Sequence, residues 1–349
     1  MVQQNSSMAE KNTISILRVI ATMGVLLVHV NQVVAFPGIL GSIASFGADG
    51  VKCFFFLTGY LVMASWQNRK STKDYWRKRL ARTIPIYYFF LLLFIVFRFG
   101  WMVEDPWAIP RAAFMLQYVA PPTVSYSYCS MYLLGVLSIF MSFYIAIPFL
   151  AKWLRSLDSA FVGFWGIVAF SVLLNKAYIV LYGQFCPLDA VQSMAKYYCN
   201  AIPYFAVGIM TYFGKREDKP VKLLAYSLFI AIFGMRYTFL DLTETGWVCL
   251  LFVILLCYPP KVMGKITMGG QLWQFDRVFG MGVFISQYWC FAVVNILSAF
   301  CPLPNGLRAV LMVALPYFAA YVIYYAVEKP GAKAINWLFD RVDRKKVRS

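Results

Sequence analysis

Long apolar stretches joined by short polar connections restrict the fold of this chain more than any other feature. Most are close to the roughly 20 residues that an α-helix needs to cross a bilayer, where only a helix or a closed barrel satisfies the backbone. The apolar segments are residues 13–36, 43–66, 83–101, 128–151, 159–181, 198–213, 223–240, 245–259, 278–300 and 309–328. We therefore predict an all-α, polytopic membrane helix bundle of about ten transmembrane helices. Two short segments and the GADG interruption of the second leave nine and eleven as alternatives.

The basic residues alternate between the two sides of this bundle. If the N-terminus is cytoplasmic, 24 of the 32 Lys and Arg fall on the cytoplasmic side. The positive-inside rule then places both termini in the cytoplasm. The formal net charge of +17 is spread in bands between apolar segments. A nucleic-acid reader gathers its charge on one face, so we expect the lipid bilayer, and not nucleic acid, as the partner.

The chain divides into residues 1–12, a cytoplasmic leader, residues 13–328, one transmembrane domain, and residues 329–349, a basic cytoplasmic tail. The first apolar segment is too long for a signal-peptide core and lacks a small-residue cleavage site, so we expect it to be retained.

Eight cysteines offer no C-x-x-C pair and no histidine at metal-ligand spacing, so no metal site is expected. Cys129, Cys186, Cys199 and Cys301 fall near the external side. A disulfide among them is one interpretation, and free buried thiols are the one we favour.

Arg18 and the single histidine, His29, lie in the first apolar segment. Eleven residues make about three helical turns, which puts both side chains on one face about 16 Å apart. Ionisable groups inside a membrane span tend to face a bundle interior or a water-filled cavity. A neutral imidazole there could accept a proton as a general base. The alternative is a histidine hydrogen-bonded for packing.

Two further polar groups adjoin this helix in the sequence. Asp49 and Lys52 stand in the second segment, either as an i, i+3 ion pair or as residues that line a cavity. Arg79 and Arg82 share a helical face ahead of the third segment. Their guanidinium groups suit bidentate capture of phosphate oxygens, whereas neighbouring lysines are more simply explained as topology anchors that bind lipid headgroups.

Four motifs in this order resemble the acyltransferase 3 family of integral membrane acyltransferases. They are Arg18 and His29 at R-x10-H spacing, GVKCFFFLTGYL at 50–61, RLARTIP at 79–85 and VEKP at 327–330. The resemblance implies a multi-pass protein of the cell inner (plasma) membrane. It implies transfer of an acetyl or other short acyl group from cytoplasmic acyl-CoA to a hydroxyl of an envelope glycan or polysaccharide. It implies no bound cofactor, because acetyl-CoA or another acyl-CoA serves as the donor substrate.

The roles implied by the resemblance follow residue by residue. His29 is the base, Arg18 binds donor phosphate or stabilises developing charge, and Arg79 with Arg82 holds the CoA end. Thr58 replaces a serine, and Lys52 an acid or proline, that many members carry. Gln287 stands where many members have a second histidine, and it cannot titrate. Glu328 is explained most simply as part of a charged, proline-terminated helix end.

No serine or cysteine occupies a recognisable nucleophile setting, so we expect direct transfer, with a separate extracytoplasmic transferase as a further partner in some systems. Two other classes of function compete. One is a transporter or flippase for an anionic glycolipid or small anion, with Arg18, Asp49, Lys52 and His29 along its path. The other is a sensor or scaffold that binds acyl-CoA without turnover.

Overall fold

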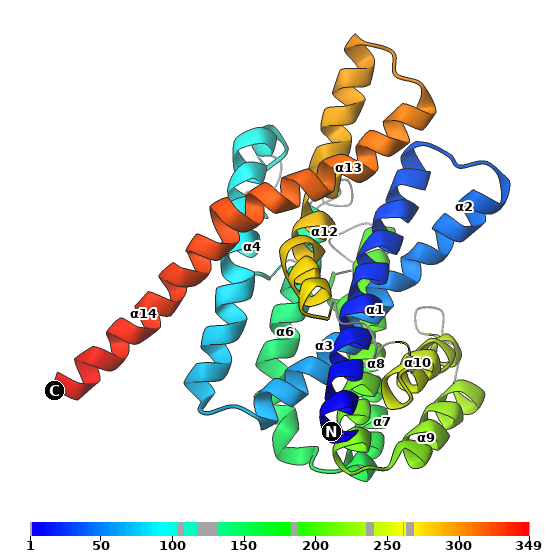
Figure 1. The fold of residues 1–349 in the computed structure, drawn as a ribbon, viewed down its shortest axis with the longest axis vertical. Helices are drawn as coiled ribbons and strands as arrows, with labels where there is room; N and C mark the ends of the chain where they lie inside the picture. Colours follow the sequence, from blue (N-terminus) through cyan, green and yellow to red (C-terminus); the bar gives the residue numbers. More distant parts are fainter. Residues whose placement is uncertain are drawn as a thin grey trace. The chain divides into compact units, whose positions relative to one another are not determined.

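The computed structural model describes residues 2–102, 108–116, 131–182, 188–234, 241–260, 262 and 269–348. Every regular element in these ranges is a helix, as predicted (Figure 1). The elements are α1 (Val2–Val33), α2 (Gly38–Ser45), the 3-10 turn η1 (Phe46–Ala48), α3 (Asp49–Gln67), α4 (Thr72–Met102), α5 (Ala108–Ala113), α6 (Met131–Trp153), α7 (Leu157–Tyr182), α8 (Leu188–Arg216), α9 (Pro220–Phe233), α10 (Leu242–Cys257), α12 (Gly269–Phe300), α13 (Asn305–Ile323), the π turn η3 (Tyr324–Glu328) and α14 (Lys329–Arg348).

Seven helical segments among the described residues are long and apolar enough to cross a membrane. They are Met8–Val33, Gly38–Gln67, Thr72–Phe97, Leu134–Trp153, Leu157–Leu181, Gln271–Phe300 and Asn305–Val342. The predicted seventh and eighth segments correspond to α9 and α10, which are shorter apolar helices, and the predicted sixth lies inside α8. The chain is thus a multi-pass membrane protein, while the count of ten and the cytoplasmic termini stay predictions.

Several helices extend beyond the apolar segments that predicted them. The ninth segment was expected to begin at residue 278, but α12 begins at Gly269 and includes Asp276 and Arg277. The helix of the last segment was expected to stop at Glu328, yet it continues through η3 into α14. Pro330 lacks an amide hydrogen, and the wider π turn just before it accommodates the unmade backbone bond. The predicted tail is therefore a helix over its described residues.

Helix contacts divide the chain into two compact units. The first unit comprises residues 1–54, 76–90 and 260–349, and the second comprises residues 55–75 and 91–259. Helices α3 and α4 contribute residues to both.

The GADG interruption has a packing explanation in the first unit. A Cβ on Gly47 would meet the carbonyl of Gly24 in α1, and a Cβ on Gly50 would meet the carbonyl of Ala21. Small residues allow two helical segments to approach this closely in a membrane protein. The turn η1 and the start of α3 therefore lie directly against the helix that carries Arg18 and His29.

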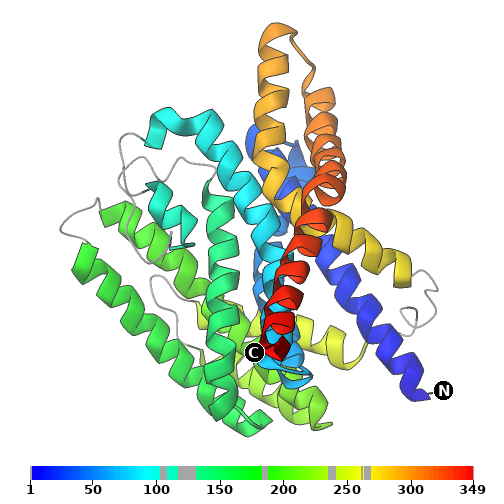
Figure 2. The same cartoon turned by 90° about the vertical axis from the view of Figure 1, so that its left-hand side faces the viewer.

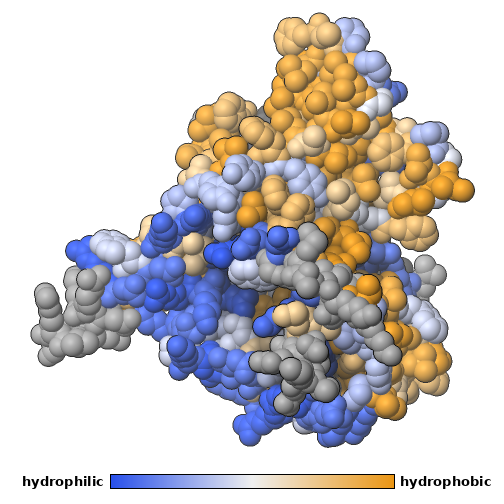
Figure 3. Space-filling view, viewed as in Figure 1, coloured by the Kyte–Doolittle hydropathy of each residue, from blue (hydrophilic) through white to orange (hydrophobic). Residues whose placement is uncertain are grey.

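Helices α12 and α13 form a hairpin in the first unit (Figures 1 and 2). They pack closely where a Cβ on Gly282 would meet Ala320. Leu26 of α1, Val283 and Phe291 of α12 and Met312 of α13 are buried in one apolar core. The far end of this hairpin presents a largely hydrophobic surface (Figure 3). The core holds α1 and α12 side by side.

Aromatic rings and glycines pack the second unit. Phe143 of α6 and Phe205 of α8 stack with ring centroids 4.0 Å apart. A Cβ on Gly59 of α3 would meet the carbonyl of Phe205, and one on Gly208 would meet the carbonyl of Phe56. This part of the FFF motif therefore packs the bundle.

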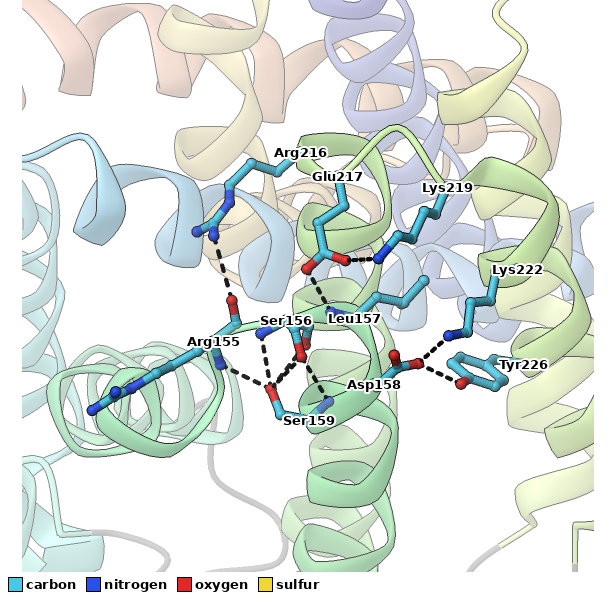
Figure 4. Close-up of polar contacts among 10 residues, drawn as sticks. All are labelled: Arg155, Ser156, Leu157, Asp158, Ser159, Arg216, Glu217, Lys219, Lys222 and Tyr226. Atoms are coloured by element: carbon cyan, nitrogen blue, oxygen red, sulfur yellow. Dashed lines mark hydrogen bonds and ion pairs between the residues drawn. The ribbon is translucent and has the colours of Figure 1, made fainter.

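Charged residues of the second unit gather where α7 begins and where α8 turns into α9 (Figure 4). Glu217 accepts a hydrogen bond from the Leu157 amide at 2.9 Å and pairs with Lys219 at 2.7 Å. Asp158 pairs with Lys222 at 2.6 Å and accepts from the Tyr226 hydroxyl at 2.5 Å. These contacts join two interhelical turns, and no predicted site residue belongs to them.

Candidate functional site

Arg18 is held by a carboxylate that the sequence analysis did not single out. Its Nη1 lies 3.1 Å from Oδ2 of Asp276, in the second turn of α12. The Asp276 side chain is 3% exposed and that of Arg18 is 15% exposed. A charge buried in an apolar bundle needs a partner of this kind. The pairing explains why the first helix tolerates an arginine.

One ring nitrogen of His29 contacts two side-chain oxygens. Its Nδ1 lies 3.0 Å from Oε1 of Gln32 and 3.0 Å from the hydroxyl of Tyr288. Because an amide oxygen only accepts, the contact with Gln32 requires a proton on Nδ1, and the Tyr288 hydroxyl can accept from the same hydrogen. In that tautomer Nε2 carries the lone pair. A proton acceptor is therefore retained on the opposite side of the ring.

These two contacts show that α1 and α12 run parallel. Arg18 and Asp276 join the helices near their N-terminal halves, and His29 and Tyr288 join them 11 and 12 residues further along. The nearly equal advance along both helices fixes a common register. It also agrees with the predicted topology, in which the first and ninth segments cross in the same direction.

Gln287 is fully buried on α12, next to Tyr288. Its Nε2 donates to the backbone carbonyl of Phe284 at 2.9 Å, and its Oε1 has no hydrogen-bond partner within the described part of the chain. The side chain that contacts His29 is thus the neighbouring Tyr288.

A second charged cluster surrounds Glu328 at the end of η3. The guanidinium groups of Arg82 on α4 and Arg277 on α12 interact with its carboxylate. Arg277 also lies 6.0 Å from the ring of Tyr324 in the same turn. Glu328 therefore sits among two arginines inside a continuing helix, which corrects the expectation of a simple helix stop. Arg79 lies one turn before Arg82, is half-buried and has contacts of its own.

Adjacent residues of α12 link the two clusters. Asp276 pairs with Arg18 on α1, while Arg277, like Arg82 of α4, interacts electrostatically with Glu328. Asp276 and Arg277, in one turn of α12, thus connect α1, which carries His29, with the Glu328 cluster that includes Arg82.

The other predicted residues fall as follows. Lys52 pairs with Asp49 at 2.6 Å, which favours the ion-pair interpretation over two separate cavity residues. Thr58 belongs to the second unit, whereas the eight other predicted site residues belong to the first. The described residues contain no group of three or more His, Cys, Asp or Glu that could hold a metal ion. Cys199 is buried and Cys301 exposed as free thiols, and Cys129 and Cys186 lie outside the described ranges.

Asp276 and Tyr288 were missed for different reasons. Asp276 was not considered as a site residue because the ninth apolar segment was expected to begin after it. The signal that could have found it is an acidic residue at the edge of an apolar segment that contains no other acid. Tyr288 is one of 23 tyrosines, and only the tertiary structure distinguishes it.

These features define a class: a helical, multi-pass membrane protein with paired charges buried between its helices. The acyltransferase domain model of the acyltransferase 3 family matches residues 11–274, and the chain belongs to that family. It is therefore a membrane acyltransferase. The match contains Arg18, His29, Arg79 and Arg82, and it ends two residues before Asp276. No curated protein and no solved structure matches the chain.

Proposed function

We propose that this protein transfers an acetyl or other short acyl group from cytoplasmic acyl-CoA to a hydroxyl of a cell-envelope glycan or polysaccharide at the inner membrane. The observation that carries the proposal is the arrangement on α1. Nδ1 of His29 contacts two oxygens, which leaves the lone pair of Nε2 to accept a proton. Arg18, on the same helix as His29, is held by Asp276 of α12.

The chemistry requires one base and one place for the donor. Nε2 of His29 takes the proton of the acceptor hydroxyl as its oxygen attacks the thioester carbonyl. When the tetrahedral intermediate collapses, the carbon–sulfur bond breaks and the CoA thiolate leaves. The imidazolium returns the proton to the thiolate, so an ester and free CoA thiol are produced and His29 is regenerated.

The arginines supply positive charge for a polyanionic donor. Arg82 is exposed and Arg79 half-buried on one face of α4, which suits contact with CoA phosphates from the membrane surface. Arg18 lies about three helical turns from His29, so we assign its positive charge, held in place by Asp276, to attracting a donor phosphate and not to the reacting carbonyl.

Direct transfer is favoured over an acyl-enzyme. The Arg18 charge acts on Cys53, which makes this thiol the natural candidate for a covalent intermediate. Cys53 is only 3% exposed, however, and is packed in the interior of α3. A nucleophile must reach the thioester carbonyl, and this one does not reach solvent.

The test is mass spectrometry of ester-linked acyl groups on envelope glycans from cells that lack the protein. The cells are complemented with wild type or with His29→Ala at matched expression. We expect wild type to restore an ester and the variant to lose transfer by roughly 10²–10⁴-fold, the usual contribution of a general base. An alanine variant with normal transfer would overturn the proposal. If deletion changes no glycan ester, the transport alternative takes its place.

A further inference from the structure

One face of the continuous helix α13–η3–α14 is exposed from its apolar part into its basic part. It carries two rows of residues spaced four apart. The first row is Phe318, Val322, Ala326, Pro330, Ala334, Leu338 and Val342, and the second is Tyr321, Tyr325, Lys329, Lys333, Trp337 and Arg341. The first row stays almost entirely apolar. The second changes from aromatic to basic at Lys329, where α14 begins.

Contacts with α4 fix which face of α14 points outward. Nη1 of Arg77 lies 2.8 Å from Oδ1 of Asp340, and its Nε donates to Oδ1 of Asn336 at 2.7 Å. A Cβ on Gly331 would meet the ring of Pro85. These contacts occupy one side of α14. Lys333, Trp337, Leu338 and Arg341 lie on the side that they leave exposed.

The exposed side combines apolar and cationic groups in the manner of an interfacial helix. Trp337 is 50% exposed and Leu338 is 53% exposed. The Arg341 guanidinium lies 5.2 Å from the Trp337 ring, and the Lys329 ammonium lies 5.2 Å from the Tyr325 ring. Aromatic rings and the stems of Lys and Arg prefer the boundary where an apolar layer meets charged headgroups.

Charge identifies the occupant of this face. Residues 329–348 contain seven Lys or Arg and two Asp, and Arg77 already neutralises Asp340. The part of α14 visible in Figure 3 is mostly hydrophilic, in contrast to the hydrophobic end of the α12–α13 hairpin. The long helix runs at an angle to α1 in both ribbon views (Figures 1 and 2), so α14 is not parallel to α1.

We propose that the exposed face of α14 binds the anionic headgroups of the adjacent lipid leaflet. Leu338, Val342 and Trp337 enter the interface, and Lys333 with Arg341 pairs with lipid phosphates. Each basic residue near an anionic leaflet contributes attraction that falls off within a Debye length. The lipid-facing side of α13 is thus continued by a side of α14 that binds lipid headgroups.

Hydrogen–deuterium exchange of the full chain tests this proposal. The protein is placed in nanodiscs of phosphatidylcholine alone, or of phosphatidylcholine and phosphatidylglycerol in equal parts. We expect amides of α14 to exchange roughly tenfold more slowly in the anionic discs, because binding suppresses local opening. Raising the salt concentration should reduce the difference.

Two variants make the test specific. Lys333→Glu with Arg341→Glu should abolish the dependence on phosphatidylglycerol, whereas Lys333→Arg with Arg341→Lys should preserve it. Equal exchange in both kinds of disc overturns the proposal, as does a charge-reversal variant that behaves like wild type. Protection that follows protein concentration instead of lipid charge also overturns it and identifies a second copy of the chain as the occupant.

Discussion

The two units differ in where they keep their charges. In the first, Arg18 and Asp276 are paired between helices that cross the membrane, and the charges of Arg82 and Arg277 act on the Glu328 carboxylate. In the second, the ion pairs drawn in Figure 4 occupy turns at helix ends, while rings and glycines fill the described interior. Buried charges are costly unless they are paired, and they are commonly functional in membranes. For this reason we place the proposed chemistry in the first unit and expect the second to contribute mainly packing.

The largest expected effect comes from removing the partner of Arg18. Asp276→Asn leaves a buried guanidinium without its carboxylate, which typically costs about 3–5 kcal/mol. We expect a large loss of folded protein after heating in detergent, read by size-exclusion chromatography. The double variant Arg18→Leu with Asp276→Leu should regain much of that stability and remain inactive. A single variant with wild-type stability would show that the pair does not support the first unit.

A packing change in the second unit should act without touching the chemistry. Gly208→Val places side-chain atoms against the Phe56 carbonyl, and overpacking of this kind costs about 1–3 kcal/mol or more. Thermal stability should fall while activity per folded molecule is kept. Gly166→Val is the matched control, since nothing lies within 4 Å of its Cβ. Loss of specific activity at full stability would contradict the division of labour between the units.

Tyr288→Phe tests the partner of His29 at nearly constant volume. The variant keeps the ring but removes one of the two oxygens at Nδ1, and a hydrogen bond of this kind is worth about 1 kcal/mol. We expect turnover to fall several-fold with little change in KM for the donor. Tyr317→Phe is the control, because the hydroxyl of Tyr317 on α13 makes a weak contact with the Met23 sulfur on α1 at 3.9 Å and does not contact His29. Equal effects of the two variants would assign Tyr288 to packing.

The smallest effect is expected at the turn of the second unit. Partial burial acts to raise the pKa of Glu217, but hydrogen bonds from Lys219 and the Leu157 amide outweigh it and leave the pKa below its ordinary value. A lowered carboxyl pKa contributes stability above the unfolded value, and that stability is lost as the pH falls through the folded value. Glu217→Gln should therefore cost less than about 1 kcal/mol at neutral pH. The gap from wild type should close in acid, and a gap that persists in acid would contradict the ionic explanation.

Patterns of local sequence predicted the helical class and one local ion pair. Apolar length indicated the spans, and i, i+3 spacing offered the Asp49–Lys52 pair that the structure contains. Partners far apart in sequence were not predictable in this way. Asp276 meets Arg18 only because α1 and α12 pack side by side, and Pro330 was wrongly taken as a stop because the π turn before it is a feature of backbone geometry. Arg79 and Arg82 were placed on one helix face without any indication that Glu328 lies beside Arg82.

The parallel register of α1 and α12 has a mechanical consequence. Two contacts at different depths connect the helices: Arg18 with Asp276, and His29 with Tyr288. Translation of one helix along its axis by a single turn, about 5.4 Å, would break both contacts at once and separate the buried charges of Arg18 and Asp276. The two helices should therefore move together as one rigid bar, and any opening that admits a substrate has to occur by motion of other helices around it.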